Sequence, residues 1–314
     1  MPVDFKQLEY FVRTAELGSF TRASVELDVA QSALSRQVRQ LEIELGRSLL
    51  IRNGRGVAPT EAGKRLLEHG RGILYQVART REEIQAAGDA LAGRVAVGLP
   101  PSFSKTLTVP LTRACRERLP QAALSITEGL SSALREALAI GRLDVALLYN
   151  PAPSPDIDSI PLLEEDFYFV TRRTGRPARR RIALRELALE PLVIPTRPNT
   201  IRLLVESALA DHGLRPRIAL EIDSVAAILD LVADGAGGAV LSIHSVMHGR
   251  HGARPSRAAA RAALPYEAIP IVQPRLRSKL AMAVSAQRPA TPTQQAVAGI
   301  IRDMVARLPG ARLP

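Results

Sequence analysis

The chain has 314 residues, which is enough for two or three domains that each bury a core. Its single cysteine, Cys115, excludes an intrachain disulfide, and no apolar run approaches the roughly 20 residues of a membrane-spanning helix. The N-terminus lacks the charged-then-apolar order of a secretory signal peptide. We therefore expect a cytoplasmic protein that does not contact a membrane.

The net charge of +11 is spread unevenly along the chain. Residues 1–58 hold eight basic and seven acidic side chains, a net charge of +1, and residues 59–92 hold five of each. The remaining +10 lies in residues 93–314, mostly in the Arg-rich stretches 172–181 and 250–261. Total charge alone is weak support for a nucleic-acid partner, so a DNA-binding prediction must rest on where individual residues lie.

The first 46 residues have the apolar spacing of three short helices. Gly18 ends the first helix, Ser19 is a suitable N-cap for the second, and the third runs from about Gln31 to Gly46. The inward-facing side chains of the first two helices are Leu8, Phe11, Val12, Ala15, Phe20, Ala23 and Leu27.

The third helix has two contrasting faces at about 100° per residue. One face is apolar, with Leu34, Val38, Leu41 and Leu45. The roughly opposite face begins with small polar side chains, Ser32 and Ser35, and continues with the cationic side chains of Arg36 and Arg39. A helix that enters a major groove needs small donors near the bases and guanidinium groups for guanine or phosphate. The alternative is the solvated face of a small helical bundle.

Two short strands, 49–52 and 57–58, flank the turn Asn53-Gly54-Arg55-Gly56. Asn-Gly is a strong hairpin signal because both residues tolerate positive φ. A wing that follows a helix-turn-helix can place the tip residue Arg55 in a minor groove. The order of elements predicts an all-α winged helix-turn-helix in residues 1–58.

The stretch SFTRASVELDVAQSALSRQVRQLEIELGRSLLIRNGRGVAPTEAG resembles the DNA-binding signature of the LysR-type transcriptional regulators. The resemblance covers nearly every position from Leu8 to Gly63. It implies double-stranded operator DNA as the partner. At Ser32 the family commonly has proline. The resemblance implies contacts to bases or nearby phosphates from Gln31, Ser32, Ser35 and Arg36, and a wing contact from Arg55.

Residues 59–92 predict a long linker helix with Thr60 as N-cap. A seven-residue repeat runs through positions 63, 70, 77, 84 and 91 and through positions 66, 73, 80 and 87. The repeat is better formed towards its C-terminal end. The repeat favours a coiled coil that pairs two DNA-binding heads in a dimer or tetramer, and the LysR resemblance implies the same. The alternative is a long helix that lies on its own domain.

Residues 93–314 alternate strands with helices, which predicts parallel sheets covered by helices. Ligands of such sheets bind at the carboxyl ends of strands, where helix N-termini attract anions. Three loops, 100–104, 129–131 and 196–200, supply hydroxyls at such positions. Because no carboxylate is expected near these loops, their hydroxyls and the adjoining helix N-termini favour a small anionic metabolite as the ligand. The alternative is that their Ser and Thr side chains are only N-caps.

This region resembles the effector domain of LysR-type regulators, which has two lobes like those of periplasmic binding proteins. The resemblance implies lobe I at about 93–164 and 268–314 and lobe II at about 165–267, with crossings near Glu164–Asp166 and Tyr266–Ile269. GRLDVALLYNP and PLLEEDFYFV most resemble the subgroup that contains the nitrogen assimilation control protein, some of whose members act without an effector. The candidate pocket residues are Ser102, Phe103, Ser131, Thr196 and Asn199.

No arrangement of residues predicts catalysis, a cofactor or a metal site. His244, His248 and His251 have helical spacing, but they have no carboxylate or cysteine partner and are interpreted as surface histidines. The segment 243–264 departs from the LysR pattern, which leaves its local structure open. A solute-binding protein and a two-domain α/β enzyme are the rival classes, and RNA polymerase is a further candidate partner.

Overall fold

The computed structural model describes residues 4–53, 56–85, 91–174, 179–247 and 264–308. The chain forms an N-terminal unit, made mostly of residues 1–88, and a C-terminal unit, made mostly of residues 89–314, and each has its own architecture. Within the described ranges, no helix has the combination of length and apolar content needed to cross a membrane.

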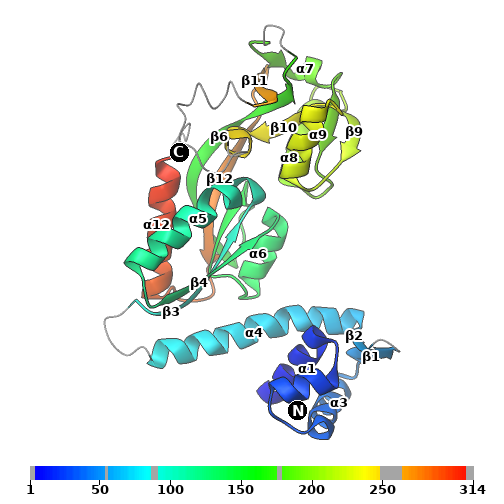
Figure 1. The fold of residues 1–314 in the computed structure, drawn as a ribbon, viewed down its shortest axis with the longest axis vertical. Coiled ribbons are helices and arrows are strands. Elements are labelled where there is room, and N and C mark those ends of the chain that lie inside the picture. The colour runs from blue at the N-terminus through cyan, green and yellow to red at the C-terminus, as the bar shows by residue number, and fades with distance from the viewer. Residues whose placement is uncertain (1–3, 54–55, 86–90, 175–178, 248–263, 309–314) are drawn as a thin grey trace. The chain divides into compact units, whose positions relative to one another are not determined.

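The N-terminal unit begins with the three predicted helices, α1 (Phe5–Leu17), α2 (Phe20–Glu26) and α3 (Gln31–Leu45) (Figure 1). Asp4 and Gln7 form a capping box at α1, and the Ser19 side chain caps α2. Gly18 ends α1 in the left-handed conformation, at φ 61°. The core of this unit contains Leu8, Tyr10, Phe11, Val12, Ala23, Leu34, Val38, Leu41 and Leu49.

The wing consists of β1 (Leu50–Asn53) and β2 (Gly56–Pro59), which pair antiparallel. The backbone N–H of Val57 donates to the Gly18 carbonyl at 2.9 Å and ties the wing to the end of α1. Gly56 has φ 135°, and a Cβ there would lie 2.6 Å from the Gly18 oxygen, so the position requires glycine. Arg55, at the tip, lies outside the described residues.

The linker helix α4 spans Glu61–Gln85, and Thr60 caps it by accepting from the Gly63 N–H at 2.9 Å. Its first half packs against its own domain. A Cβ at Gly63 would lie 2.0 Å from the Leu49 carbonyl oxygen, and one at Gly70 would lie 2.8 Å from Val12. Leu66, Leu67 and Leu74 also pack against this core. Over residues 63–70, the prediction that the repeat pairs with a partner helix is therefore wrong. Here the alternative is correct, a helix that lies on its own domain.

The second half of α4 presents its apolar positions to solvent. Ile73 and Ile84 are 47% and 72% exposed, and Thr80 between them is exposed. These positions continue the predicted repeat beyond the contact with the head. The stripe Ile73–Val77–Thr80–Ile84 is the part of the repeat that remains for another helix.

The C-terminal unit is built around a mixed eight-stranded sheet of order β4-β3-β5-β12-β6-β11-β7, with β10 also paired to β6. Its first strands are β3 (Gly93–Leu99), β4 (Ala122–Glu128) and β5 (Val145–Tyr149), and β3 pairs parallel with β4 and β5. The α/β two-lobed class is confirmed. The expectation of parallel sheets alone is wrong, since β6, β10, β11 and β12 pair antiparallel.

The 16-residue strand β6 (Ile157–Arg172) runs through both lobes. It passes from one lobe to the other at the predicted crossing, Glu164–Asp166. The second crossing is not at Tyr266–Ile269, because those residues pair with Phe169–Arg172 in lobe II. Arg277–Lys279, at the start of β12 (Arg277–Ser285), pairs with Glu164–Asp166 and makes that crossing. β11 spans Tyr266–Val272.

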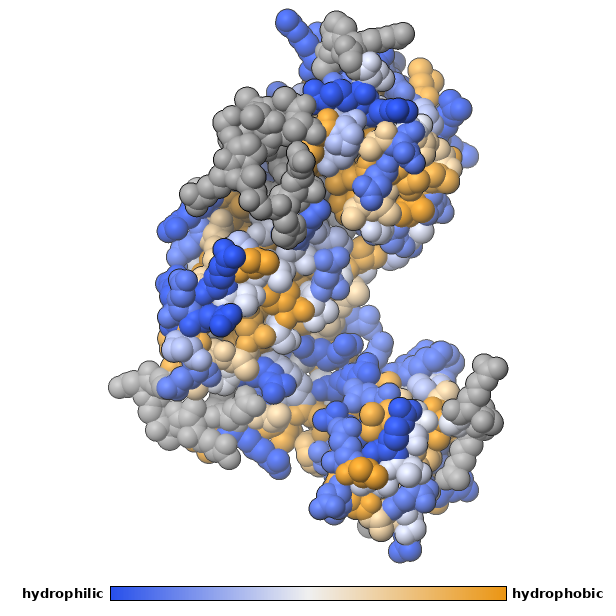
Figure 2. All heavy atoms as spheres, in the orientation of Figure 1, coloured by the Kyte–Doolittle hydropathy of each residue, from blue (hydrophilic) through white to orange (hydrophobic). Residues whose placement is uncertain are grey.

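Each lobe has a separate core. In lobe I, α5 (Pro101–Arg118) and α12 (Pro292–Ala306) pack with the sheet around Phe103, Leu111 and Ile301, and α6 spans Ser131–Ala139. The remaining elements of lobe II are β7 (Ile182–Ala183), α7 (Leu184–Leu187), β8 (Pro191–Ile194), α8 (Thr200–Ala210), β9 (Arg217–Glu221), α9 (Val225–Asp234), β10 (Ala239–Ser242) and α10 (Ile243–Met247). Figure 2 shows apolar surface on the lobe that carries α8 and β9, where Leu203, Ile218 and Leu220 are partly exposed.

Candidate DNA-binding helix and inter-lobe cleft

The helix α3 has the two predicted faces over most of its length, but Leu45, its last residue, was predicted to face the core and is 40% exposed. Leu34, Val38 and Leu41 are at most 2% exposed and pack into the head. Gln31, Ser32, Arg36 and Arg39 are exposed, and Ser35 is half-buried. The N-cap residue is Ala30, whose side chain accepts no hydrogen bond from the first turn, in contrast to Asp4 and Ser19 at α1 and α2. Because no side chain caps this helix, its N-terminal end is a place where the helix dipole favours an anion such as a phosphate.

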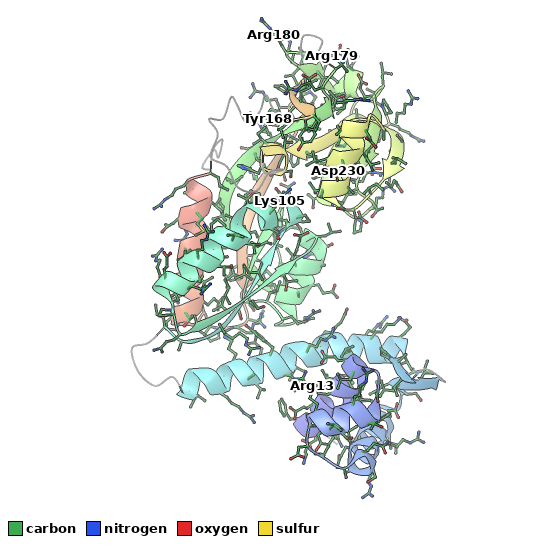
Figure 3. The ribbon with its side chains drawn as sticks, in the orientation of Figure 1. Arg13, Lys105, Tyr168, Arg179, Arg180 and Asp230 are labelled. Atoms are coloured by element: carbon green, nitrogen blue, oxygen red, sulfur yellow. The ribbon has the colours of Figure 1, made fainter. Side chains whose placement is uncertain are left out.

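The guanidinium groups of α3 are also available. Arg36 and Arg39 make no ion pair or hydrogen bond with the residues that the structure describes. Arg13 in the same unit behaves differently, because it pairs with Glu16 at 3.2 Å and with Glu26 at 3.5 Å (Figure 3). The arginines on the outer face of α3 therefore keep their charge uncompensated, as a DNA-contacting face requires.

In the C-terminal unit, a cavity of about 730 Å³ lies between the lobes at the start of α5 and the start of α9. Both lobes contribute hydroxyl, charged and apolar side chains to its wall. From lobe I come Pro101, Ser102, Ser104, Lys105, Thr108, Val109 and Glu128, and from lobe II come Asp223, Ser224, Val225, Ala226 and Ser245.

Of the five predicted pocket residues, Ser102 is in this wall. Phe103 follows it but is fully buried in the lobe I core, because the helix turns its side chain away. Ser131, at the start of α6, accepts from the Tyr149 backbone N–H at 3.0 Å and joins α6 to the end of β5. Neither of these two predicted residues lines the cavity.

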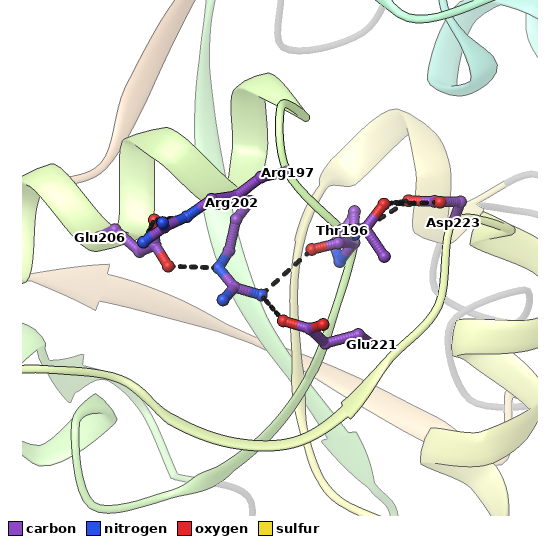
Figure 4. A network of polar contacts seen from close by, with 7 residues as sticks. Thr196, Arg197, Arg202, Glu206, Glu221 and Asp223 are labelled. Atoms are coloured by element: carbon purple, nitrogen blue, oxygen red, sulfur yellow. Dashed lines mark hydrogen bonds and ion pairs between the residues drawn. The ribbon is translucent and has the colours of Figure 1, made fainter.

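Thr196, which is shown in Figure 4, and Asn199 also have structural partners. The Thr196 backbone N–H and hydroxyl both donate to the Asp223 carboxylate, at 2.7–2.9 Å. Asn199 caps α8 by accepting from the Ile201 N–H at 2.9 Å. Thr196 thus acts by orienting Asp223, a lining residue that the sequence analysis missed.

A buried arginine fixes the same loop from the opposite side. Arg202 is 5% exposed and donates to Glu206 at 2.5 Å, to Glu221 at 2.8 Å and to the Pro195 carbonyl at 3.3 Å (Figure 4). Partial burial raises the pKa of Glu206, but the hydrogen bonds from Arg202 and Arg197 outweigh that effect and lower it overall. The charge pairs hold together α8, β9 and the end of β8.

A buried polar cluster joins the two lobes behind the cavity wall. Ser102 Oγ lies 2.8 Å from the Tyr149 hydroxyl, which donates to Glu165 on β6. Glu165 is 3% exposed, and burial raises its pKa to about 7 despite hydrogen bonds from Tyr149 and Ser242. Its Oε2 atom has no hydrogen-bond partner among the described residues and lies 3.8 Å from His244 Nε2.

Two sequence interpretations are corrected at this site. His244 is not a surface histidine: it is 2% exposed, and its ring centroid lies 5.4 Å from that of Phe103. His248 and His251 lie outside the described residues, and the described ranges contain no group of side chains suited to hold a metal ion. The expected absence of a nearby carboxylate is also wrong, because Glu128 and Asp223 line the cavity. Glu128 is the last residue of β4 and Asp223 follows the end of β9, so their places at the carboxyl ends of strands were the sequence signal available for finding them.

Known families match both units. A model described as the LysR substrate binding domain matches residues 88–306, and one described as the bacterial regulatory helix-turn-helix protein, lysR family, matches residues 5–64. The chain is a LysR-type transcriptional regulator.

This LysR-type regulator has curated relatives that align with about three quarters or more of its length. The nitrogen assimilation regulatory protein nac of Klebsiella aerogenes is 35% identical over 306 residues, 97% of this chain and 96% of the relative. The HTH-type transcriptional regulator BbuR of Bordetella bronchiseptica is 31% identical over 77% of this chain and 74% of its own. The sequence resemblance to the nac subgroup is thereby confirmed.

Solved structures agree with this assignment. A full-length OxyR variant from Pseudomonas aeruginosa has a TM-score of 0.70 and 26% identity, covering 100% of this chain and 98% of its own. Full-length CbnR in complex with its target DNA has a TM-score of 0.69 and 24% identity, covering 96% and 99%. These matches, like the curated relatives, are transcription regulators, so this LysR-type chain is a DNA-binding regulator with an effector-binding domain and not an enzyme.

Proposed function

We propose that α3 enters the major groove of an operator and that Gln31, Ser32, Ser35, Arg36 and Arg39 form its DNA-contacting face. The observation that carries this proposal is the exposed outer face of α3, with two arginines that have no ion-pair partner in the described part of the chain and an N-terminus that no side chain caps. Arg55 in the wing is the proposed minor-groove contact, on the LysR resemblance. Residues 1–58 then serve as the DNA-binding domain, residues 59–92 as the linker and residues 93–314 as the effector domain, in a cytoplasmic protein.

Genomic footprinting in the parent cell first identifies the operator, and binding to that site is then measured at a fixed salt concentration. Arg36→Ala should weaken binding by about 1–3 kcal/mol, because the variant loses a base or phosphate contact. Circular dichroism should be unchanged, since Arg36 is exposed.

Arg116→Ala is the matched control, because it removes an exposed arginine from α5 in the other unit. Operator affinity that is the same in Arg36→Ala and in Arg116→Ala would reject α3 as the DNA-contacting element.

We infer that two copies pair through the exposed stripe of α4, since LysR-type regulators form oligomers. Ile84 is 72% exposed although it is apolar, and it lies at the end of α4 far from the contacts of Gly63 and Gly70. Ile84→Lys should weaken dimerisation in sedimentation experiments, because it places a charge in the proposed helix seam. Arg81→Lys, an exposed and charge-conserving change on the same helix, is the control. A dimer of undiminished stability in Ile84→Lys would exclude this stripe as the interface.

We propose that the cavity between the lobes binds a small-molecule effector whose binding shifts the regulator between conformations. A ligand has this effect only if its affinity differs between the conformations. The cavity wall draws on both lobes, and Ser102 connects it to the buried cluster at the β6 crossing. A ligand there would bias the lobe arrangement directly.

A further inference from the structure

The cavity wall carries fixed charges of both signs. Lys105 projects from α5 on the side that faces the other lobe (Figure 3), Glu128 ends β4, and Asp223 precedes α9. All three side chains are exposed, and none forms an ion pair with another described residue. Two carboxylates and one ammonium therefore border the cavity without an ion-pair partner among the described residues.

The Asp223 carboxylate is held in place by the protein. It accepts two donors from Thr196, and the Arg202 guanidinium anchors the adjoining Pro195 carbonyl. Neither donor carries a formal charge, so the carboxylate keeps its attraction for a cation. A negative charge that is oriented before binding costs little reorganisation when a cationic group arrives.

The opposite charge preference comes from Lys105, supported by the start of α9. Val225 and Ala226, in the first turn of this ten-residue helix, line the cavity, and the Ser224 side chain accepts from the Ala227 N–H at 3.3 Å. The positive end of a helix favours an anionic group at this place. Val109 and Val225 add apolar surface for a short side chain.

A ligand with only one kind of charge suits this wall poorly. A pure anion would pair with Lys105 but would enter next to Glu128 and Asp223, and a pure cation would meet the ammonium of Lys105. Like charges disfavour one another at short range, and exclusion of water strengthens the effect. A ligand that carries both an ammonium and a carboxylate compensates both kinds of wall charge.

We propose that the effector of this cleft is a zwitterion of the α-amino-acid class, whose ammonium pairs with Asp223 and Glu128 and whose carboxylate pairs with Lys105. This inference rests on the proposed function of the cleft as an effector site. It replaces the purely anionic metabolite that the sequence favours, because that expectation assumed a wall without carboxylates.

Calorimetric titration of the full-length chain with each of the twenty common L-amino acids tests the proposal. Each amino acid that binds is compared with its deaminated acid and its decarboxylated amine, as 4-methylpentanoate and 3-methylbutylamine are for leucine. The amino acid should bind at least about tenfold more tightly than either analogue, since each analogue leaves one wall charge uncompensated.

Variants assign the two charges. Asp223→Asn should abolish the preference over the deaminated acid, and Lys105→Gln should abolish the preference over the amine. Asp211→Asn and Lys279→Gln, which change exposed charges that do not line the cavity, should leave both preferences intact.

A deaminated acid that binds as tightly as its amino acid would overturn the proposal, and so would binding of none of the twenty. Operator binding by the same preparation separates these results from the proposed function. Normal operator binding alongside either negative result leaves the DNA-binding regulator standing without a zwitterion site. Failure to bind any operator would contradict the DNA-binding function itself, whatever the titrations show.

Discussion

The outer face of α3 and the loops around the cleft use similar polar residues in opposite ways. On α3, Arg36 and Arg39 are exposed and unpaired within the described residues, and no side chain caps the helix. Around the cleft, Thr196 and Asn199 are bonded within the protein, and the buried Arg202 donates to two carboxylates and a carbonyl. The comparison shows that polar residues in the head are available for a partner, whereas most of those predicted for the cleft maintain its shape.

The largest expected effect is the loss of the buried arginine. Arg202→Leu should destabilise lobe II by about 3–5 kcal/mol, because it leaves Glu206 without its closest cation at a site that is largely shielded from water. Hydrogen exchange of α8 and β9 in the full-length chain measures the effect locally.

Arg197→Ala is the control for this prediction. Arg197 pairs with the same Glu206 at 3.0 Å but its side chain is 68% exposed, so its removal should cost below about 1 kcal/mol. Equal protection of α8 in Arg202→Leu and Arg197→Ala would contradict a structural role for Arg202.

The next largest effect is a pH dependence that comes from Glu165. Its pKa is about 7 in the folded chain, against 4.5 for an unperturbed glutamate. Between these values the folded chain retains a proton that the unfolded chain releases. The free energy of unfolding should therefore fall by up to about 3 kcal/mol as pH rises from about 4.5 to 7, and then level off.

Urea unfolding between pH 5 and pH 8 tests this, with the C-terminal unit followed by hydrogen exchange. Glu165→Gln, which keeps the neutral form, should flatten this part of the pH dependence. The half-buried neighbour Glu164, changed to Gln, should leave it intact. If the free energy of unfolding of Glu165→Gln falls with rising pH as steeply as that of the unchanged chain, this prediction is wrong.

The smallest effect concerns the residue that orients Asp223. Thr196→Val removes the hydroxyl donor but keeps the backbone donor at 2.9 Å, so the stability of lobe II should fall by only about 1–2 kcal/mol. Thermal unfolding checks this value. Thr196→Ser restores the donor and should regain most of the loss, which separates the hydrogen bond from the loss of shape. A valine variant with full stability would mean that the backbone bond is sufficient.

The difference between the two regions also explains how much could be predicted. The faces of α3 follow from helical periodicity over 15 consecutive residues, so the sequence alone determined which side chains point outward. The caps at Ser19, Thr60 and Asn199 were likewise predictable, because capping depends on neighbours within a few residues.

The cleft depends on residues that are far apart in the chain. The burial of His244 beside Phe103 and Glu165, and the meeting of Lys105, Glu128 and Asp223 at one cavity, follow from strand order and from β6 passing through both lobes. The same reason applies to α4, where heptad spacing is equally compatible with packing on a partner helix or on the head. Only the close approach of Leu49 and Val12 to Gly63 and Gly70 assigned its first half to the head. Local periodicity and capping are encoded by near neighbours, whereas the identity of the surface that covers a given face is decided by tertiary packing.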